Sequence, residues 1–469
     1  MARESWTGRI GFVLAAVGSA VGLGNIWRFP WMTAENGGSA FLVVYLGIVL
    51  AVGVPGLLAE FVLGRRSRKS PVGALRDLSG SRNWGRVGLV SVLAGLVLLS
   101  FYSVVGGWIL RYLVASPTGA YFADPGGYFD AIAHGPGAAA FHVLFLGLTA
   151  GVVYGGVRAG IERATTVMMP VVVLVLAGMA MWASGLGGAA DAYAFYLEFD
   201  VASVQENALD VALAAAGQAL FTLSVGAGTM ITYASYVGED RSLPADATMI
   251  AVLNTAVGVL AGLVVLPLLF STPGVDAATS GPGALFVGVA TAFATLPAGE
   301  LLAAGFFAVV ALAALSSSIS MLEIVVAYLV DERGFARDRA TVGVAAVVLV
   351  TGTASAFSPQ LFGLLAGPVV DVVLTTGLLA FVVFTAWVLG PDAVEEFARG
   401  TRFSAGLGDA WRTLLGVALP PFLVFTLFVG VSDAVGVTVA SWQLALAAVA
   451  VAGVVVAGVV RARRPRPTA

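Results

Sequence analysis

Neutral oxygen-bearing side chains lie inside strongly apolar stretches at three distant points of this sequence. Asn25 stands in AVGLGNIWRFP, Thr222 in LFTLSVGAG and Asn254 in an otherwise apolar segment. Uncharged amide and hydroxyl oxygens are hard ligands, which suit an alkali cation that arrives from water. Polar residues inside membrane-spanning segments are functional candidates by default. The three side chains therefore predict a site for a monovalent cation.

A second polar group is the run of three serines at positions 316–318, in the stretch LSSSIS. Consecutive residues do not share one face of a helix, so at most two of these hydroxyls can serve one site. A serine in a helix also bonds back to its own backbone, which leaves a purely structural role open.

Two glycine clusters interrupt segments that are long enough to cross a bilayer. Gly18, Gly22 and Gly24 lie in the first segment, and Gly226 and Gly228 lie in the sixth. Each glycine costs ~1 kcal/mol relative to alanine inside a helix, so we expect both helices to break. Lipid cannot satisfy the freed backbone groups, which must face protein, water or a ligand. Breaks at matching positions of two five-helix units indicate an inverted-repeat transporter with a midplane site, whereas close helix packing is the alternative explanation of the glycines.

The composition is that of a polytopic, all-α membrane protein. Of 469 residues, 59% are hydrophobic and only 11% are charged, which is far more apolar than a soluble domain. Cysteine is absent and histidine occurs twice, so thiol chemistry, disulfides and a histidine-rich metal site are excluded. The net charge of −3 argues against a nucleic-acid partner.

Apolar runs of spanning length occur twelve times, which predicts twelve transmembrane helices. They lie near 9–31, 40–63, 87–114, 138–157, 164–183, 208–237, 245–270, 302–330, 340–357, 361–390, 411–431 and 440–461. Arginines gather in the loops on one side, whereas the opposite loops carry acidic residues such as Asp124, Asp191 and Glu300. By the positive-inside rule, the protein spans the cell membrane with both termini in the cytoplasm, and we interpret the basic clusters as topology signals rather than partner sites.

Two ionisable side chains lie at or near membrane depth. Glu60, in the second segment, is predicted to bond to N–H groups freed by the break in the sixth, although a proton-linked role stays open. His142, near the start of the fourth segment, is interpreted as a packing residue. The outside loop 271–301 is predicted to form either a short helical lid above the pore or an ordinary structured loop.

Four motifs resemble the neurotransmitter:sodium symporter family, prokaryotic branch: AVGLGNIWRFP, ENGGSAF, GQALFTLSVGAGTMITYASYV and LSSSI. The resemblance covers nearly the whole chain. It implies Na⁺-coupled uptake by a fold of two inverted five-helix repeats, with helices 1 and 6 discontinuous, and two peripheral helices. The corresponding division is a cytoplasmic segment at 1–8, repeats at 9–183 and 208–390, peripheral helices within 411–461 and a basic cytoplasmic tail at 462–469.

The resemblance also implies the residues that hold ions and substrate. One Na⁺ would contact the Ala20 carbonyl, Asn25, Thr222 and Asn254. A second Na⁺ would contact the carbonyls of Gly18, Val21 and Ala313 and the hydroxyls of Ser316 and Ser317. The substrate-binding residues would be Ala20, Gly22, Leu23, Gly24, Leu98, Tyr102, Phe221, Thr222, Ser224, Ala227, Ser317 and Met321. Half-helix N-terminal ends attract anions and unwound carbonyls attract cations, which supports this assignment.

Two positions bear on the substrate class. Gly22 stands where amine transporters of the family carry an aspartate, so the substrate must bring its own carboxylate, which points to an α-amino acid. Ala227 stands where leucine-type relatives carry a bulky aromatic residue, which leaves room for a large apolar or aromatic amino acid.

The gates of the family are matched unevenly. Its cytoplasmic latch is matched by Arg3, Trp6, Tyr236 and Asp331, and its outer gate by Arg28, Phe221 and Gln218. In the family an aspartate normally faces the arginine of the outer gate, but here Gly363 and Ala366 occupy the corresponding positions. Asp371 is the candidate to replace that aspartate. Chloride-independent relatives in the family place an acid near the first Na⁺ site in the seventh segment, where this sequence has the uncharged Asn254 and Gly258. The resemblance therefore implies that a chloride ion could be held by Tyr45, Gln218 and Thr222, with Ser224 or a neighbouring hydroxyl.

Three other classes of protein fit parts of this pattern. A proton-coupled amino-acid or small-amine carrier of the same fold would use Glu60 or His142. An intramembrane enzyme is disfavoured because cysteine is absent and no Ser/His/Asp arrangement occurs. A receptor or chaperone on a transporter scaffold is disfavoured by the intact ion-site residues. The sequence leaves the oligomeric state open.

Overall fold

The computed structural model describes residues 5–198, 208–272, 283–401 and 405–435, together with the isolated positions 450 and 453. All regular structure within these ranges is helical. Among the described residues, nine stretches are long and apolar enough to cross a membrane, and a pair of helices bent by 51° passes the same test as a tenth span. The described part of the chain therefore confirms the all-α membrane fold, and the expected segment 440–461 lies outside it except at 450 and 453.

Helices of very different lengths follow one another along the chain. They are α1 (Arg9–Ala20), η1 (Gly24–Arg28), α2 (Phe29–Glu35), α3 (Ser39–Ile48), η2 (Val49–Gly53), α4 (Val54–Ser67), α5 (Pro71–Ser79), α6 (Arg82–Val87), α7 (Leu89–Ala115), η3 (Ser116–Thr118), α8 (Pro125–Ala133), α9 (Pro136–Tyr154), η4 (Val157–Glu162), α10 (Arg163–Ala183), α11 (Ala189–Leu197), α13 (Ala208–Thr222), α14 (Thr229–Ala234), α15 (Leu243–Phe270), α16 (Ala284–Ala294), α17 (Gly299–Arg333), α18 (Arg337–Phe357), α19 (Pro359–Leu364), η5 (Leu365–Val369), α20 (Val370–Val383), η6 (Phe384–Leu389), α21 (Pro391–Ala398), α22 (Ala405–Thr413), η7 (Leu414–Ala418) and α23 (Leu419–Ala434).

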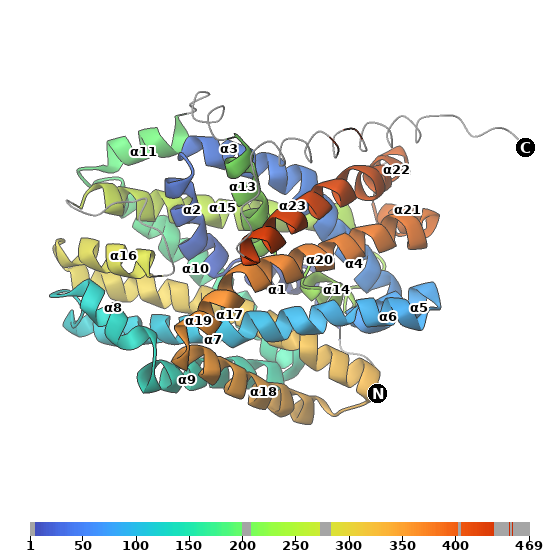
Figure 1. Ribbon diagram of the computed structural model, residues 1–469, viewed down its shortest axis with the longest axis horizontal. Helices are drawn as coiled ribbons and strands as arrows, with labels where there is room; N and C mark the ends of the chain where they lie inside the picture. The colour runs from blue at the N-terminus through green and yellow to red at the C-terminus, as the bar shows by residue number, and fades with distance from the viewer. Residues whose placement is uncertain are drawn as a thin grey trace, which may run out of the picture.

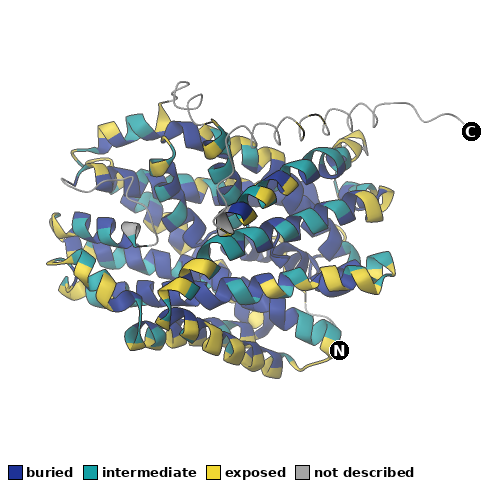
Figure 2. Ribbon diagram, in the orientation of Figure 1, coloured by how far each residue is buried: buried dark blue, intermediate teal, exposed yellow. Residues whose placement is uncertain are grey.

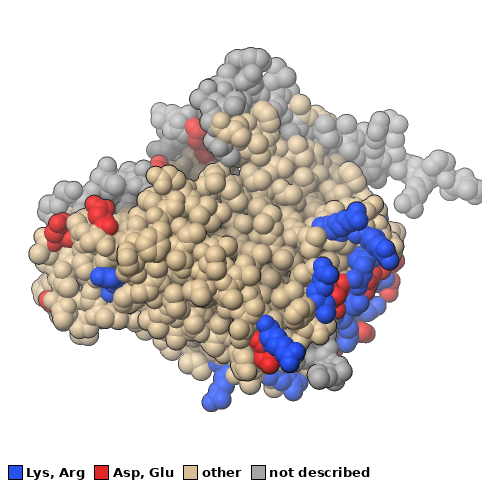
Figure 3. Space-filling model, turned by 60° about the horizontal axis from the view of Figure 1, so that its bottom comes forward, with Lys and Arg blue, Asp and Glu red and all other residues tan. Residues whose placement is uncertain are grey.

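The long helices run side by side, and the short ones lie at the two ends of the bundle. Helices α5, α6, α21 and α22 lie at one end, and α8, α11 and α16 lie at the other (Figure 1). Lysine and arginine side chains gather at one end (Figure 3), and this basic end is the one that carries the α5–α6 region. The predicted lid segment contains a helix, α16, although residues 273–282 of that loop lie outside the described ranges.

Burial follows the pattern expected of a protein surrounded by lipid. The faces that the helices turn toward one another are buried, and the exposed positions lie on the outer faces and at the ends (Figure 2). Many of the exposed side chains are large and apolar, such as Leu174, Leu301 and Val350. A continuous apolar exterior of this kind is stable in hydrocarbon but not in water.

The first span breaks after Ala20. The backbone at Val21 is extended, with φ −76° and ψ 106°, so the α-helical ladder stops there. The chain resumes at η1 and α2 in a direction 51° away from α1. The predicted discontinuity in the first segment is confirmed.

The sixth span breaks between α13 and α14. Ser224, Gly226 and Gly228 have positive φ values of 53°, 93° and 76°, a conformation that favours glycine. A Cβ atom on Gly226 would lie 2.0 Å from the carbonyl oxygen of Leu374, so glycine is required there for space as well. The second predicted discontinuity is confirmed.

Glu60 satisfies the backbone that the second break exposes. The side chain, on α4, is completely buried. One carboxylate oxygen accepts from the Gly226 N–H at 2.6 Å, and the other accepts from the Met230 N–H at 3.2 Å. The predicted structural role of Glu60 is therefore confirmed by its contacts.

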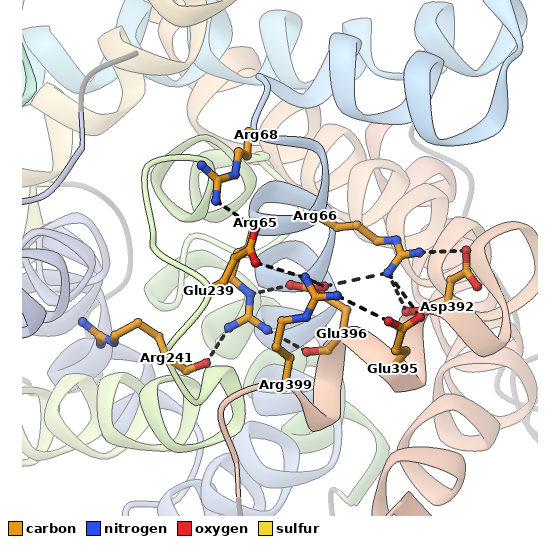
Figure 4. Close-up of polar contacts among 9 residues, drawn as sticks. All are labelled: Arg65, Arg66, Arg68, Glu239, Arg241, Asp392, Glu395, Glu396 and Arg399. Atoms are coloured by element: carbon orange, nitrogen blue, oxygen red, sulfur yellow. Dashed lines mark hydrogen bonds and ion pairs between the residues drawn. The ribbon is translucent and has the colours of Figure 1, made fainter. Parts of the chain in front are cut away.

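A buried ion pair fixes the helices at the basic end. Arg65 on α4 points toward Glu396 on α21 (Figure 4), and their side chains are only 0% and 1% exposed. Arg65 also donates to the carbonyl oxygens of Arg241, at 2.5 Å, and of Glu396, at 2.7 Å. The pair thus joins three separate parts of the chain. The sequence interpretation, which treated this arginine as a topology signal, missed its structural role.

We expect Glu396→Gln to lower the free energy of unfolding by about 3–5 kcal/mol, because it leaves the buried Arg65 guanidinium without its counter-ion. The matched control is Glu395→Gln on the same helix, whose side chain is 63% exposed and whose loss should cost about 0–1 kcal/mol. Denaturant unfolding in detergent micelles, followed by tryptophan fluorescence, measures both. Equal stabilities for the two variants would contradict the assignment.

Candidate functional site

Three distant side chains meet beside the break in the first span. Asn25 lies on η1, Thr222 at the end of α13 and Asn254 on α15, and all are at most 1% exposed. The Asn25 amide nitrogen donates to the backbone oxygen of Asn254 at 2.8 Å, and the Thr222 hydroxyl lies 3.4 Å from the Asn254 amide oxygen. The structure therefore brings together the three residues that the sequence singled out as cation ligands.

One end of the Asn254 amide lies between two carbonyl oxygens, and its contacts favour the NH₂ group over the oxygen at this point. The Asn254 Oδ1 atom lies 3.2 Å from the carbonyl oxygens of both Ala20 and Thr222. Oxygen acceptors so close repel one another unless a positive group lies between them. Rotation of the amide would direct its NH₂ group at both carbonyls instead, so amide hydrogens and a small cation are alternative solutions at the same point.

A second oxygen cluster joins the end of α1 to α17. The Ser316 hydroxyl lies 2.9 Å from the Ala313 carbonyl oxygen and 3.3 Å from that of Val21. The Ser317 hydroxyl lies 3.1–3.5 Å from three carbonyl oxygens, those of Gly18, Ser19 and Val21. Each hydroxyl has one proton to donate, and the Ser224 hydroxyl also donates to the Ser19 carbonyl oxygen at 3.1 Å, so three protons face four carbonyl oxygens. This excess of acceptors fits a cation.

Ser318 faces away from this cluster. Its hydroxyl lies 2.7 Å from that of Thr149 on α9 and 2.8 Å from the Leu315 carbonyl oxygen of its own helix. The prediction that at most two of the three serines can face one site is confirmed, because the helical turn directs the third toward a different neighbour.

A pocket lies between the two breaks. It is lined by Ser19, Ala20, Gly22, Gly24, Leu98, Tyr102, Phe221, Ser224, Ala227, Thr229, Ser317, Met321 and Leu374. Ten of the twelve predicted substrate residues are in this lining. The other two adjoin it: the Leu23 N–H donates to the Tyr102 hydroxyl at 3.1 Å, and Thr222 belongs to the first oxygen cluster.

Sequence reasoning missed three lining residues, Ser19, Thr229 and Leu374. Ser19 and Thr229 directly adjoin the glycine breaks, so their position next to the motifs was the signal that pointed to them. Leu374 lies on α20, in an apolar run without a motif, and only its packing against the sixth span brings it into the pocket.

The residues predicted to form an inner gate are partly described. The Trp6 indole donates to the Tyr233 carbonyl oxygen at 3.0 Å, and the Tyr236 hydroxyl donates to Glu323 at 3.0 Å. Asp331 accepts from the Ser70 N–H at 2.8 Å. Arg3, the predicted latch arginine, lies outside the described residues.

At the outer gate, Arg28 lies over the Phe221 ring, with its Cζ atom 5.1 Å from the ring centroid. The Gln218 amide donates to the Gly24 carbonyl oxygen at 2.7 Å. Asp371 and Arg28 form no direct ion pair in the described structure, and Asp371 lines a separate pocket with Gly217 and Leu220. The role of Asp371 as a substitute gate carboxylate stays a prediction.

A further hydroxyl group directly follows the first oxygen cluster along the chain. The buried Thr255 hydroxyl, next to Asn254 in the sequence, has no hydrogen-bond partner among the described residues. A Cβ atom on Gly258 would lie 3.7 Å from the Asn25 amide nitrogen, so this glycine leaves the neighbourhood without a carboxylate. Hydroxyl donors near an uncharged wall are suited to a small anion.

Comparison with known proteins finds similarity over nearly the full length. The model of the sodium:neurotransmitter symporter family matches residues 3–122 and 132–459. YhdH of Bacillus subtilis, an uncharacterised sodium-dependent transporter, is 38% identical over 327 residues, covering 69% of this chain and 71% of the relative. Another uncharacterised sodium-dependent transporter, from Methanocaldococcus jannaschii, is 31% identical over 461 residues, which cover 92% of this chain and 91% of the relative.

A solved structure is also similar to this one. It is the crystal structure of MhsT in complex with L-phenylalanine, which is 35% identical in sequence and has a TM-score of 0.82. The similarity covers 92% of this chain and 100% of that chain.

Ser317→Ala should weaken stabilisation by Na⁺, because it removes a hydroxyl oxygen from the second cluster, whereas Ser318→Ala should not. The Na⁺ concentration that gives half of the maximal rise in unfolding temperature should increase roughly tenfold for Ser317→Ala, as expected for loss of one polar contact to a charge. Thermal unfolding of the purified chain in NaCl or choline chloride measures this. An identical Na⁺ response in both variants would contradict the cluster.

Proposed function

Because this chain belongs to the sodium:neurotransmitter symporter family, we propose that it takes up an α-amino acid together with Na⁺ by alternating access. The family consists of transporters rather than enzymes. The pocket between the two broken spans is the proposed substrate site, and the two oxygen clusters beside it are the proposed sites of the co-transported ions.

The observation that carries the amino-acid assignment is the environment of Gly22. A Cβ atom there would lie 2.1 Å from the Ser317 hydroxyl and 2.7 Å from the Tyr102 hydroxyl. An aspartate at this position would have to displace these hydroxyls, and with glycine there the pocket wall supplies no carboxylate of its own. A substrate that carries both a carboxylate and an ammonium group would complete the site, with the carboxylate next to the Leu23 N–H and the Tyr102 hydroxyl.

The apolar part of the pocket supports a large apolar or aromatic side chain. Leu98, Phe221, Met321 and Leu374 provide apolar walls, and Ala227 keeps one wall short. The similar structure of MhsT holds L-phenylalanine, which is a substrate of this type. A mismatch of one methylene group in such a pocket changes affinity by about 1–3 kcal/mol.

Na⁺ at both clusters would provide the energy for accumulation. One ion would be held by the Ala20 carbonyl, Asn25, Thr222 and Asn254, and the other by the Gly18, Val21 and Ala313 carbonyls with Ser316 and Ser317. Each charge that crosses 100 mV releases about 2.3 kcal/mol, and each tenfold gradient adds about 1.4 kcal/mol. Two ions supply roughly 7 kcal/mol, enough for about five decades of accumulation.

The architecture that we propose for this cycle is two inverted repeats, 9–183 and 208–390, with both termini cytoplasmic. The basic end that carries α5 and α6 then faces the cytoplasm. Trp6, Tyr236 and Asp331 would close the pocket on that side, and Arg28, Phe221 and Asp371 on the other. The direct contacts at Trp6 and Tyr236 support an inner gate that is closed in this conformation.

Asn25→Ala and Thr222→Ala should each lower Na⁺-dependent uptake by roughly ten- to a hundredfold, because each removes an oxygen that faces the ion. Thr248→Ala is the control, since that exposed hydroxyl bonds only to its own helix at Pro244. The substrate is first identified by thermal-shift screening of the twenty amino acids with and without Na⁺, and uptake is then measured in proteoliposomes. Normal uptake by both variants would contradict the ion site, and uptake driven by a pH gradient without Na⁺ would favour the proton-coupled alternative.

We also propose a chloride site formed by Tyr45, Gln218, Thr222 and a neighbouring hydroxyl such as Thr255 or Ser224. Its support is the buried Thr255 hydroxyl, which has no partner among the described residues, and the absence of an acid at Gly258. Replacement of chloride by gluconate should then slow Na⁺-dependent uptake several-fold, and Gly258→Glu should reduce this dependence by supplying a fixed negative charge. Uptake that is unchanged in gluconate would remove the proposal.

A further inference from the structure

A cleft opens at the basic end, between the α5–α6 region and the end of α17. Its volume is about 310 Å³, which is within the range of small-molecule pockets. It is lined by Val72, Arg76, Arg82, Gly85, Arg86, Leu89, Tyr328, Glu332 and Arg333. The lining thus contains four arginines and a single acidic residue, and it shares no residue with the pocket between the broken spans.

The acidic groups near this cleft are already neutralised by other cations. Glu332 pairs with Arg76 through two guanidinium contacts. The neighbouring Asp77 accepts from Lys69 at 2.5 Å and from Arg76 at 2.7 Å. Neither carboxylate is therefore left to balance the remaining arginines.

Three guanidinium groups of the cleft are not paired with a carboxylate in the described structure. Arg82 and Arg86 form no ion pair with any residue in the described ranges, and both are exposed. Arg333 donates only to the Tyr328 hydroxyl, at 3.2 Å, and lies over the Tyr328 ring. Because Arg82 and Arg86 are four residues apart on α6, their side chains share one face of the helix. The cleft therefore offers a concentrated positive charge with the planar donors that match phosphate oxygens.

The helix that follows the two arginines is apolar on its outer face. Leu89, which lines the cleft, is 42% exposed, and Leu93 one turn further along α7 is 51% exposed. Exposed leucines in a spanning helix contact acyl chains. A ligand in the cleft would thus have its charge next to the arginines and could extend an apolar tail along α7.

We propose that this cleft binds the phosphate headgroup of an anionic phospholipid in the leaflet at the basic end. Free phosphate shares the headgroup chemistry, but the exposed leucine ridge beside the arginines favours a lipid. Basic pockets between transmembrane helices on the cytoplasmic side are suited to such headgroups. This site is additional to the proposed transport function and does not depend on it.

A headgroup in this cleft would join α6 to the cytoplasmic end of α17. Glu332, which lines the cleft, directly follows Asp331 in the sequence. The Asp331 carboxylate accepts a hydrogen bond from the Ser70 N–H, just before α5. The lipid would therefore strengthen the same junction that the inner latch uses.

The test is lipid-dependent thermal stabilisation of the full-length chain in detergent, with added phosphatidylglycerol, phosphatidylcholine or inorganic phosphate as the probe. Ligands that bind the folded state raise the unfolding temperature according to their affinity. The variant R82Q/R86Q should need roughly tenfold more phosphatidylglycerol for half of the maximal shift. R333Q tests the same cleft from a different helix and should shift in the same direction.

The matched control is R163Q/R339Q, which removes two exposed arginines without ion pairs in the described structure, on α10 and α18. It should respond to phosphatidylglycerol like the unmodified chain. Equal responses of R82Q/R86Q, R333Q and the control would overturn the proposal. A shift by phosphatidylcholine equal to that by phosphatidylglycerol would overturn recognition of the charge, and a shift by inorganic phosphate at the same concentration would overturn the lipid as the occupant.

Discussion

Backbone groups that are freed inside a membrane must find partners within the protein or its ligands, and this constraint organises the centre of the molecule. The break between α13 and α14 exposes N–H groups, and the buried Glu60 carboxylate accepts two of them. The break after α1 exposes N–H groups and carbonyl oxygens, and the hydroxyls of Ser316, Ser317 and Ser224 offer three protons to four of these carbonyls. One break is thus completed by the protein, whereas the other keeps an excess of acceptors that suits the proposed cation.

The same breaks shape the pocket. Gly22 has no room for a side chain beside Ser317 and Tyr102, and Gly226 has none beside Leu374. The backbone thus lies close to side-chain hydroxyls at the first break and to the backbone of α20 at the second, which brings oxygen clusters and apolar walls into one small space. A substrate carboxylate and a cation would attract one another there, so binding of either would favour binding of the other.

Charge is used in two different ways at the basic end. Arg65 is fully buried and has its counter-ion Glu396 and two carbonyl oxygens as partners, so it stabilises the contact between α4 and α21. Arg82 and Arg86 are exposed and have no such partner in the described ranges, so their charge remains available to a ligand. Arginines of one loop region therefore differ in role because their surroundings differ in burial.

The sequence by itself determined the membrane class, the long apolar helices of the described part, both breaks and the polar side chains that meet in the oxygen clusters. These features depend on local properties: long apolar runs, glycines that weaken a helix and polar groups that lipid excludes. Tertiary structure alone decided that Leu374 lines the pocket, that Arg65 meets Glu396 across 331 positions and that Arg82, Arg86 and Arg333 surround one cleft. Those contacts join residues from separate helices, and no local pattern encodes which helices pack together.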